Sequence, residues 1–182
     1  MAARSATPSR LPSLTLVLGG ARSGKSAYAE ALVESAGRGV YLATAEAGDA
    51  EMAERIRRHR RRRGESWLTV EEPLDLAGTL RQHALPGRPI LVDCLTLWLS
   101  NLMAAGRDVD GETAALAGRL ASLAGPVVLV SNEVGLGLVP ETPLGRAFRD
   151  HAGRLHQTIA RLADRVIFIA AGLPLILKDT QE

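Results

Sequence analysis

The stretch GGARSGKS, residues 19–26, carries residue types that bind a nucleoside triphosphate. Gly19, Gly24, Lys25 and Ser26 fit the pattern G-x-x-x-x-G-K-[ST] of a phosphate-binding loop. Glycines let backbone amides turn inward around phosphate oxygens, and the positive end of a following helix points at the same oxygens. We expect Lys25 to reach the β- and γ-phosphates and Ser26 to bind Mg²⁺. The loop residues expected to bind nucleotide are Gly19, Gly20, Ala21, Arg22, Ser23, Gly24, Lys25 and Ser26. The alternative is a chance glycine-rich turn.

Two acidic residues follow apolar runs further along the chain. Asp93 ends the run ILVD, where an acid at a strand's carboxyl end can bind the Mg²⁺ of a nucleotide site. It could also cap the next helix, and that role could coexist with binding the metal. Glu133 could approach the phosphates, approach the hydroxyl that accepts a phosphate, or order the glycine-rich stretch after it, and the residues leave these roles open. Cys94 is expected to be a small buried hydrophobic residue.

The stretch RIRRHRRRRG, residues 55–64, places His59 among seven arginines. Such a run is typical of a solvated helix face or a surface for polyanions, whereas a histidine can act as a nucleophile or base near neutral pH. On a helix capped by Asp49, the residues Met52, Ile56 and His59 share one face. From the residues alone, a histidine on that inward face is more typical of a satisfied core residue.

The composition is that of a globular protein whose positive charge is concentrated in one place. Hydrophobic residues make up 46% of the 182 residues, and the formal net charge is +2. Without the seven arginines of residues 55–63, 15 basic residues remain against 20 acidic ones, so a wide polyanion surface is not expected. Cys94 is the only cysteine, which excludes an internal disulfide and favours a reducing, cytoplasmic compartment. Residues 1–13 lack the apolar core of a secretory signal and are expected to form a flexible tail.

Apolar strands alternate with helical stretches along the rest of the chain. The expected strands are 14–18, 39–44, 89–93, 126–131, 165–170 and 173–178. The expected helices are 27–37, 50–63, 73–85 with Pro73 at its start, 96–106, 111–125 and 144–163. This alternation favours a parallel sheet with helices on both faces. We therefore predict a single α/β domain over residues 14–182, with no membrane span.

Four stretches together resemble one enzyme family: GGARSGKS, YLATAEAGDAEMAERIRRHRRRRGESW, ILVDCLTLWLSNLM and VSNEVGLGLVPETPLGRAFRDHAGRLHQ. From residue 14 to 178 the chain resembles the bifunctional adenosylcobinamide kinase and adenosylcobinamide-phosphate guanylyltransferase family of cobalamin biosynthesis. Many NTPases share the phosphate loop, but the R-I-x-x-H and N-E-V-G-x-G-x-V-P-E patterns are much more specific. The resemblance implies a P-loop NTPase (RecA-like) fold with a mostly parallel central sheet flanked by helices.

The resemblance also implies a reaction pair and its residues. The family phosphorylates adenosylcobinamide with ATP or GTP, and then transfers GMP from GTP to that phosphate through a guanylylated histidine, here His59. Nearby arginines would keep this histidine neutral, as an attacking imidazole must be, and would stabilise charge on phosphate oxygens. The positions that match GTP contacts are Thr44, Ala45, Glu46, Arg60, Arg61, Arg62, Arg63, Glu71 and Asp93. The density of arginine around His59 departs from the family pattern.

The implied partners are adenosylcobinamide, a nucleoside triphosphate and Mg²⁺, and the implied assembly is a trimer-based homo-oligomer. Three other functions stay open. One is a P-loop small-molecule kinase without guanylyl transfer. Another is a nucleic-acid-binding NTPase that uses the arginine run. The third is a nucleotide-gated regulator without chemistry, which the guanylylation motif does not support. Aromatic residues for base stacking make up only 3% of the chain, with Trp67 alone near the run, so we do not expect a nucleic-acid partner.

Overall fold

The computed structural model describes residues 11–45 and 67–180. The predicted tail up to residue 10, the predicted helix 50–63 and the site residues Glu46, His59 and Arg60 to Arg63 lie outside the described residues.

The described residues form a seven-stranded sheet with the order β3-β2-β4-β5-β1-β6-β7. All neighbouring strands pair in parallel except β6 and β7, which are antiparallel, so the predicted mostly parallel sheet is confirmed. The strands are β1 (Leu14–Gly19), β2 (Gly39–Ala43), β3 (Trp67–Glu71), β4 (Ile90–Asp93), β5 (Val127–Asn132), β6 (Arg165–Ala170) and β7 (Leu173–Asp179). The apolar sequence of β1 suits its central place, because every residue of that strand is buried.

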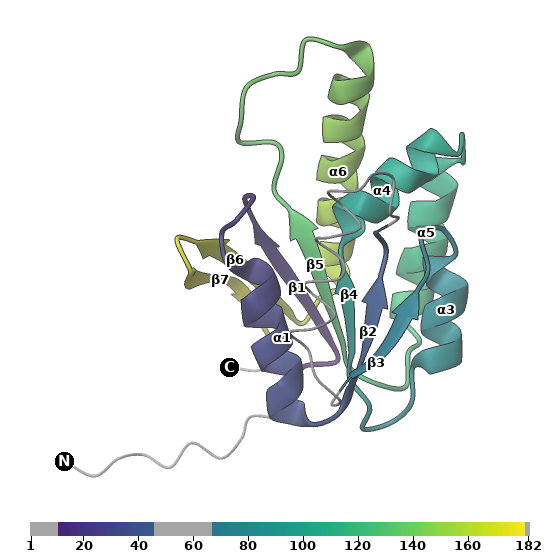
Figure 1. Cartoon of the computed structure of the whole chain (residues 1–182), viewed down its shortest axis with the longest axis vertical. Helices are drawn as coiled ribbons and strands as arrows, with labels where there is room; N and C mark the ends of the chain where they lie inside the picture. The colour runs from purple at the N-terminus through teal and green to yellow at the C-terminus, as the bar shows by residue number, and fades with distance from the viewer. Residues whose placement is uncertain (1–10, 46–66, 181–182) are drawn as a thin grey trace, which may run out of the picture.

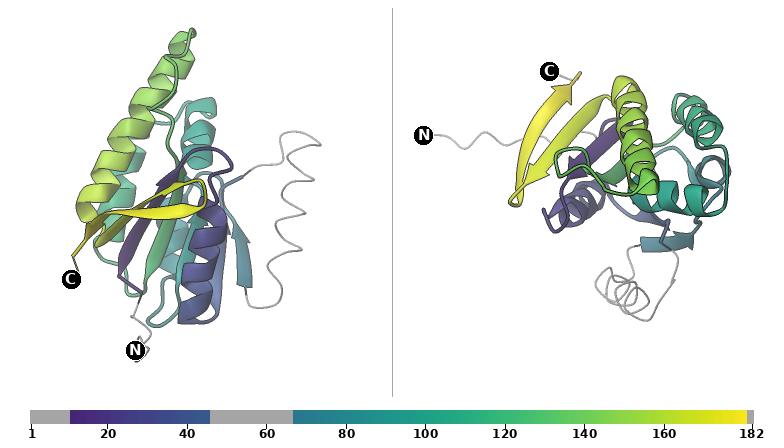
Figure 2. Two further views of the ribbon diagram at one scale, coloured as in Figure 1. Left: turned by 90° about the vertical axis from the view of Figure 1, so that its left-hand side faces the viewer. Right: turned by 90° about the horizontal axis from the view of Figure 1, so that it is seen from above.

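Helices cover both faces of the sheet, as Figure 1 and the view from above in Figure 2 show. The helices are α1 (Lys25–Ala36), α3 (Leu76–His83), α4 (Leu95–Ala104), α5 (Val109–Leu120) and α6 (Pro143–Leu162). Val17 packs in the core under α1, whereas Leu16 and Leu18 pack in the core under the other helices. Alternate residues of one strand therefore serve two cores, which explains why β1 is apolar throughout.

The structure differs from the predicted elements in two places. The strand β3 was not predicted, because WLTVE is a short edge strand with polar residues and only Trp67 is buried. The helix predicted from Pro73 begins at Leu76, because the Asp75 side chain accepts a hydrogen bond from the Gly78 amide at 2.9 Å and caps the helix. The other predicted helices and strands within the described residues are confirmed with shifts of a few residues at their ends.

Candidate active site

The phosphate loop joins β1 to α1 at the carboxyl edge of the sheet, where the parallel strands end (Figure 1). Gly24 is the N-cap of α1, and no side chain of the described residues caps this helix. The first-turn amides of a helix have no intrahelical acceptor, so they can donate hydrogen bonds to an anion. The predicted loop therefore has the backbone of an anion site.

The two pattern glycines are required by the space and the backbone conformation at their positions. A Cβ atom on Gly19 would lie 2.6 Å from both the Ile169 carbonyl oxygen and Ser23 Oγ. Gly24 has a φ of 97°, which side chains rarely adopt. The Gly172 amide, in the β6–β7 turn, donates to the Ser23 carbonyl at 2.9 Å. Residues far along the chain thus hold the loop in shape.

Lys25 lies inside the loop with only 8% of its surface exposed. Its Nζ donates to the Gly20 carbonyl oxygen at 3.0 Å. Ser26 follows it in the first turn of α1 and is partly buried. The structure therefore brings together the predicted cation and the predicted hydroxyl ligand, one residue apart at the start of a helix.

Asp93 and Glu133 lie at the same edge as the loop. The Glu133 amide donates to the Gly19 carbonyl at 3.0 Å, so Glu133 adjoins the first loop residue. Asp93 ends β4, which is separated from β1 by β5 alone. Asp93 does not cap the next helix, because the N-cap of α4 is Cys94, and Asp93 Oδ2 accepts from the Tyr41 hydroxyl at 2.7 Å. The capping alternative is thus wrong.

Glu133 is connected to a buried pair of polar side chains. One oxygen, Oε1, accepts from the Gly135 amide, so Glu133 does order the glycine-rich stretch. The other, Oε2, lies 3.8 Å from His156 Nδ1. The opposite ring nitrogen, His156 Nε2, lies 2.7 Å from Ser131 Oγ. Burial lowers the pKa of His156 from its ordinary value, although the Glu133 charge opposes that effect, so the imidazole is neutral near pH 7.

Thr44 and Cys94 form a separate hydrogen-bonded group where β2 and β4 end. The Thr44 hydroxyl donates to the Cys94 carbonyl at 2.7 Å and accepts from the Cys94 amide at 2.9 Å. Asn101 Nδ2 donates to the Thr44 carbonyl at 2.7 Å and to the Pro73 carbonyl at 3.2 Å. Burial raises the pKa of the Cys94 thiol, and Cys94 is the small buried residue that was predicted. This group fixes the point at which the chain leaves β2.

The predicted nucleotide residues within the described part of the chain lie along one edge of the sheet, and Asp93 adjoins Thr44, whose amide donates to the Asp93 carbonyl at 3.2 Å. The phosphate loop and Asp93 lie on β1, β4 and the turn between β1 and α1. Thr44 and Ala45 follow β2, and the exposed Glu71 ends the edge strand β3. Four strand spacings separate β3 from β1, which is about 19 Å. We infer that Glu71 is too far from the loop to contact the same phosphate as Lys25.

Sequence reasoning missed several residues that support the site, namely Tyr41, Asn101, Ser131, His156 and Gly172. His156 carried a detectable signal, because it shares the buried stripe of α6 with Ala152, Leu155 and Ile159. A polar residue on such a stripe needs a buried partner. Its partner Ser131 is 25 positions away and could not be identified from spacing.

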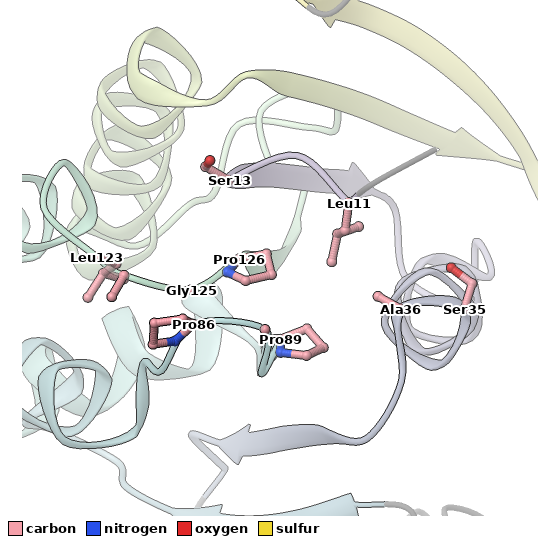
Figure 3. Close-up of a pocket in the computed structure, with 11 residues that line it drawn as sticks. Leu11, Ser13, Ser35, Ala36, Pro86, Pro89, Leu123, Gly125 and Pro126 are labelled. Carbon is pink, nitrogen blue, oxygen red and sulfur yellow. The ribbon is translucent and has the colours of Figure 1, made fainter. Parts of the chain in front are cut away.

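A pocket of 330 Å³ lies at the opposite edge of the sheet, lined by residues that include Leu11, Ser35, Pro89 and Pro126 (Figure 3). No charged side chain lines it among the described residues, so it does not have the chemistry of a triphosphate site. Within residues 11–45 and 67–180, no helix is long and apolar enough to cross a membrane. The same residues contain no cluster of three or more His, Cys, Asp or Glu side chains for a metal ion.

Comparisons with known proteins identify relatives along almost the whole chain. Residues 15–177 match the family described as cobinamide kinase / cobinamide phosphate guanyltransferase. The chain is 55% identical over 166 residues to the bifunctional adenosylcobalamin biosynthesis protein CobP of Pseudomonas aeruginosa, covering 90% of this chain and 96% of that relative. It is 37% identical over 180 residues to the bifunctional adenosylcobalamin biosynthesis protein CobU of Escherichia coli, covering 91% and 99%.

Solved structures show the same fold at low sequence identity. The flagellar accessory protein FlaH from Methanocaldococcus jannaschii aligns with a TM-score of 0.53 and 15% identity over 94% of this chain and 81% of that chain. A solved ATPase domain aligns with a TM-score of 0.52 and 15% identity over 93% of this chain and 78% of that domain. These likenesses confirm the predicted P-loop NTPase fold.

Proposed function

The chain belongs to the cobinamide kinase / cobinamide phosphate guanyltransferase family, and we propose that its two reactions use two different sets of residues. It is a bifunctional transferase of adenosylcobalamin biosynthesis, like its curated relatives, and its substrates are a cobinamide and a nucleotide. The phosphate loop carries the kinase reaction, and His59 carries guanylyl transfer.

In the kinase reaction, the loop binds the triphosphate of ATP or GTP. The α1 amides and the Lys25 ammonium hold the β- and γ-phosphates, and the adenosylcobinamide hydroxyl attacks the γ-phosphorus. The observation that carries this assignment is an uncapped helix start with a buried lysine, beside Glu133 and at the same sheet edge as Asp93. A site of this kind stabilises the charge that spreads over the phosphate oxygens during transfer.

In the guanylyl reaction, His59 attacks the α-phosphorus of GTP and pyrophosphate leaves. The phosphate of adenosylcobinamide phosphate then displaces the histidine, which gives adenosylcobinamide-GDP. The support is the R-I-x-x-H pattern in a chain that matches the family along nearly its whole length. Glu46 and Arg60 to Arg63 are proposed to bind this GTP, with Thr44, Ala45 and Glu71 on the flanking strand ends.

Magnesium is proposed as the metal of the kinase site. Ser26 and Asp93 offer a hydroxyl and a carboxylate, and Mg²⁺ prefers oxygen ligands of this kind. Mg²⁺ commonly takes its remaining ligands from substrate phosphates and water, which agrees with the lack of a three-residue cluster among the described residues. When bound, Mg²⁺ would neutralise charge on the β- and γ-phosphates.

The experiment that tests the division is a pair of assays on one preparation. Phosphate transfer to adenosylcobinamide and GMP transfer to adenosylcobinamide phosphate are followed by mass spectrometry of the products. We expect both products from the wild type and only the first from His59→Asn, because an asparagine cannot form a phosphoramidate. Loss of both products in a folded His59→Asn protein would contradict the proposal that the two reactions use separate sets of residues.

We also propose that the protein is a homo-oligomer in the cytoplasm. The support for the oligomer is apolar surface at the edge strand β7, where Leu173, Leu175, Ile176 and Leu177 are each more than half exposed. Exposed apolar patches of this kind often contact another protein. Light scattering on the purified chain should give the mass of a trimer or a multiple of it, and a monomer at micromolar concentration would contradict this part of the proposal.

A further inference from the structure

The side chains of Ser131, His156 and Glu133 form a line from the buried sheet to the edge that holds the phosphate loop. Ser131 is fully buried and His156 is 7% exposed, whereas the Glu133 side chain is 22% exposed. Ser131 pairs with Leu18 of β1, and Glu133 adjoins Gly19 through a backbone hydrogen bond of 3.0 Å. The line therefore ends in a partly exposed carboxylate beside the loop.

We propose that Glu133 is the general base that takes the proton of the adenosylcobinamide hydroxyl in the kinase step, and that His156 and Ser131 are positioning residues for it. The proposal rests on the proposed function, because it assigns a residue to that kinase reaction. Neither the phosphate-loop pattern nor the family description assigns a proton acceptor.

The step balances with the substrates of the kinase. As the hydroxyl oxygen forms a bond to the γ-phosphorus, its proton passes to a Glu133 carboxylate oxygen. The bond between the γ-phosphorus and the β–γ bridging oxygen breaks, and its electron pair leaves with the nucleoside diphosphate. A base placed within hydrogen-bond reach of a reacting hydroxyl contributes about 10²- to 10⁴-fold to a rate.

His156 and Ser131 are too buried to be the nucleophile and base of a hydrolase, although their spacing resembles that arrangement. A neutral His156 with a proton on Nδ1 directs that N–H toward Glu133 Oε2 and accepts from the Ser131 hydroxyl at Nε2. This tautomer gives the Ser131 hydroxyl an acceptor, and its Nδ1–H faces a carboxylate oxygen that lies beyond hydrogen-bond distance at 3.8 Å. The Gly135 amide donates to the other carboxylate oxygen, Oε1, so the carboxylate has a hydrogen bond on one side and the His156 ring on the other.

The loop that follows Glu133 gives a second reason to place the organic substrate there. Leu136, Leu138 and Val139 are 82%, 96% and 65% exposed, and the loop and α6 extend beyond the carboxyl edge of the sheet (Figures 1 and 2). The carbon framework of a large organic substrate could contact these side chains while its hydroxyl reaches Glu133. Asp93, on the other side of β5, is already assigned to the metal.

The first test compares Glu133→Gln with Glu141→Gln, which removes an exposed carboxylate from the same loop. We expect kcat for phosphate transfer to fall about 10²-fold in Glu133→Gln, with little change in KM. Formation of the GMP adduct from GTP in the same preparation should equal that of the wild type, as should both reactions in Glu141→Gln. A Glu133→Gln kinase rate within threefold of the wild type overturns the proposal, and so does equal damage to both reactions. A wild type without kinase activity would instead contradict the proposed function.

The second test separates positioning from packing at His156. Asparagine places its amide near the position of Nδ1 and keeps an N–H that faces Glu133, whereas glutamine places its amide near Nε2 and faces Ser131. If His156 positions Glu133, His156→Asn should keep a higher kinase kcat than His156→Gln, by about tenfold. Equal rates, or the reverse order, in variants whose melting temperatures are matched would overturn the positioning role.

Discussion

The phosphate loop and the end of β2 lie at the same edge of the sheet but use their polar groups in opposite ways. At the loop, no side chain of the described residues caps the amides at the start of α1, so these amides can bind a ligand. At the end of β2, the amide, carbonyl and hydroxyl of Thr44 all have protein partners, namely Asp93, Asn101 and Cys94. One region is thus a preformed anion site, and the other is an anchor for the chain that leads to residues 46–66.

The largest expected effect comes from removing the cation of the anion site. Lys25→Ala should lower kcat/KM for phosphate transfer about 10³-fold and weaken triphosphate binding, because preorganised charge at the reacting phosphate is lost. Titration calorimetry with the triphosphate and a kinase assay measure both effects. Lys178→Ala is the matched control, since it removes the only other lysine, which donates to carbonyls at the end of α6. Wild-type nucleotide affinity in a folded Lys25→Ala protein would refute the loop assignment.

Asp93→Asn tests the link between the two regions. An amide keeps the size of the side chain and can still accept from Tyr41, but it loses the charge that binds Mg²⁺. The Mg²⁺ concentration that half-saturates the kinase should rise about tenfold or more. Tyr41→Phe is the control, because it removes the hydrogen bond and keeps the carboxylate. Identical Mg²⁺ titrations for Asp93→Asn and the wild type would leave Asp93 without a metal role.

Asn101→Ala tests whether the end of β2 is an anchor. The change leaves the buried Thr44 carbonyl without its donor, so we expect a loss of about 1–3 kcal/mol in the free energy of unfolding. Urea denaturation measures it, with Ser35→Ala as the control, because the Ser35 side chain donates an exposed hydrogen bond to the Leu32 carbonyl. At a temperature where both proteins are folded, guanylyl transfer should fall more than phosphate transfer. A larger fall in phosphate transfer than in guanylyl transfer would contradict the role of the β2 end as an anchor for the chain that leads to His59.

The smallest expected effect is a pH dependence of stability from His156. The pKa of His156 in the folded protein lies below the ordinary value of 6.5. As the pH falls below 6.5, His156 therefore takes up a proton in the unfolded chain before it does so in the folded protein. The stabilising contribution is present above that pH and is lost on acidification. Between about pH 7.5 and about pH 5.5, the melting temperature of the wild type should therefore fall more than that of His156→Asn. Parallel curves would show that His156 titrates freely in the folded protein.

The two regions also differ in how far the sequence predicts them. The phosphate loop follows from a local pattern, because two glycines, a lysine and a serine at fixed spacing need only a strand before them and a helix after them. The contact of Gly172 with Ser23 and the pair of His156 with Ser131 join distant elements, so spacing cannot reveal them. The strand β3 was missed because an edge strand buries little and keeps polar residues. Proline at position 73 suggested a helix start, but the Asp75 side chain supplies the cap.

The proposal that the two reactions use separate residues depends most on one assignment. It assigns GMP transfer to His59 and not to the phosphate loop. The direct measurement is mass spectrometry of the intact protein after incubation with GTP and Mg²⁺, followed by peptide mapping before and after mild acid. We predict one GMP-sized adduct on His59, lost in acid because a phosphoramidate is acid-labile, and absent from His59→Asn, which still phosphorylates adenosylcobinamide. An adduct on any other residue, or GMP transfer at the wild-type rate by His59→Asn, would contradict this assignment.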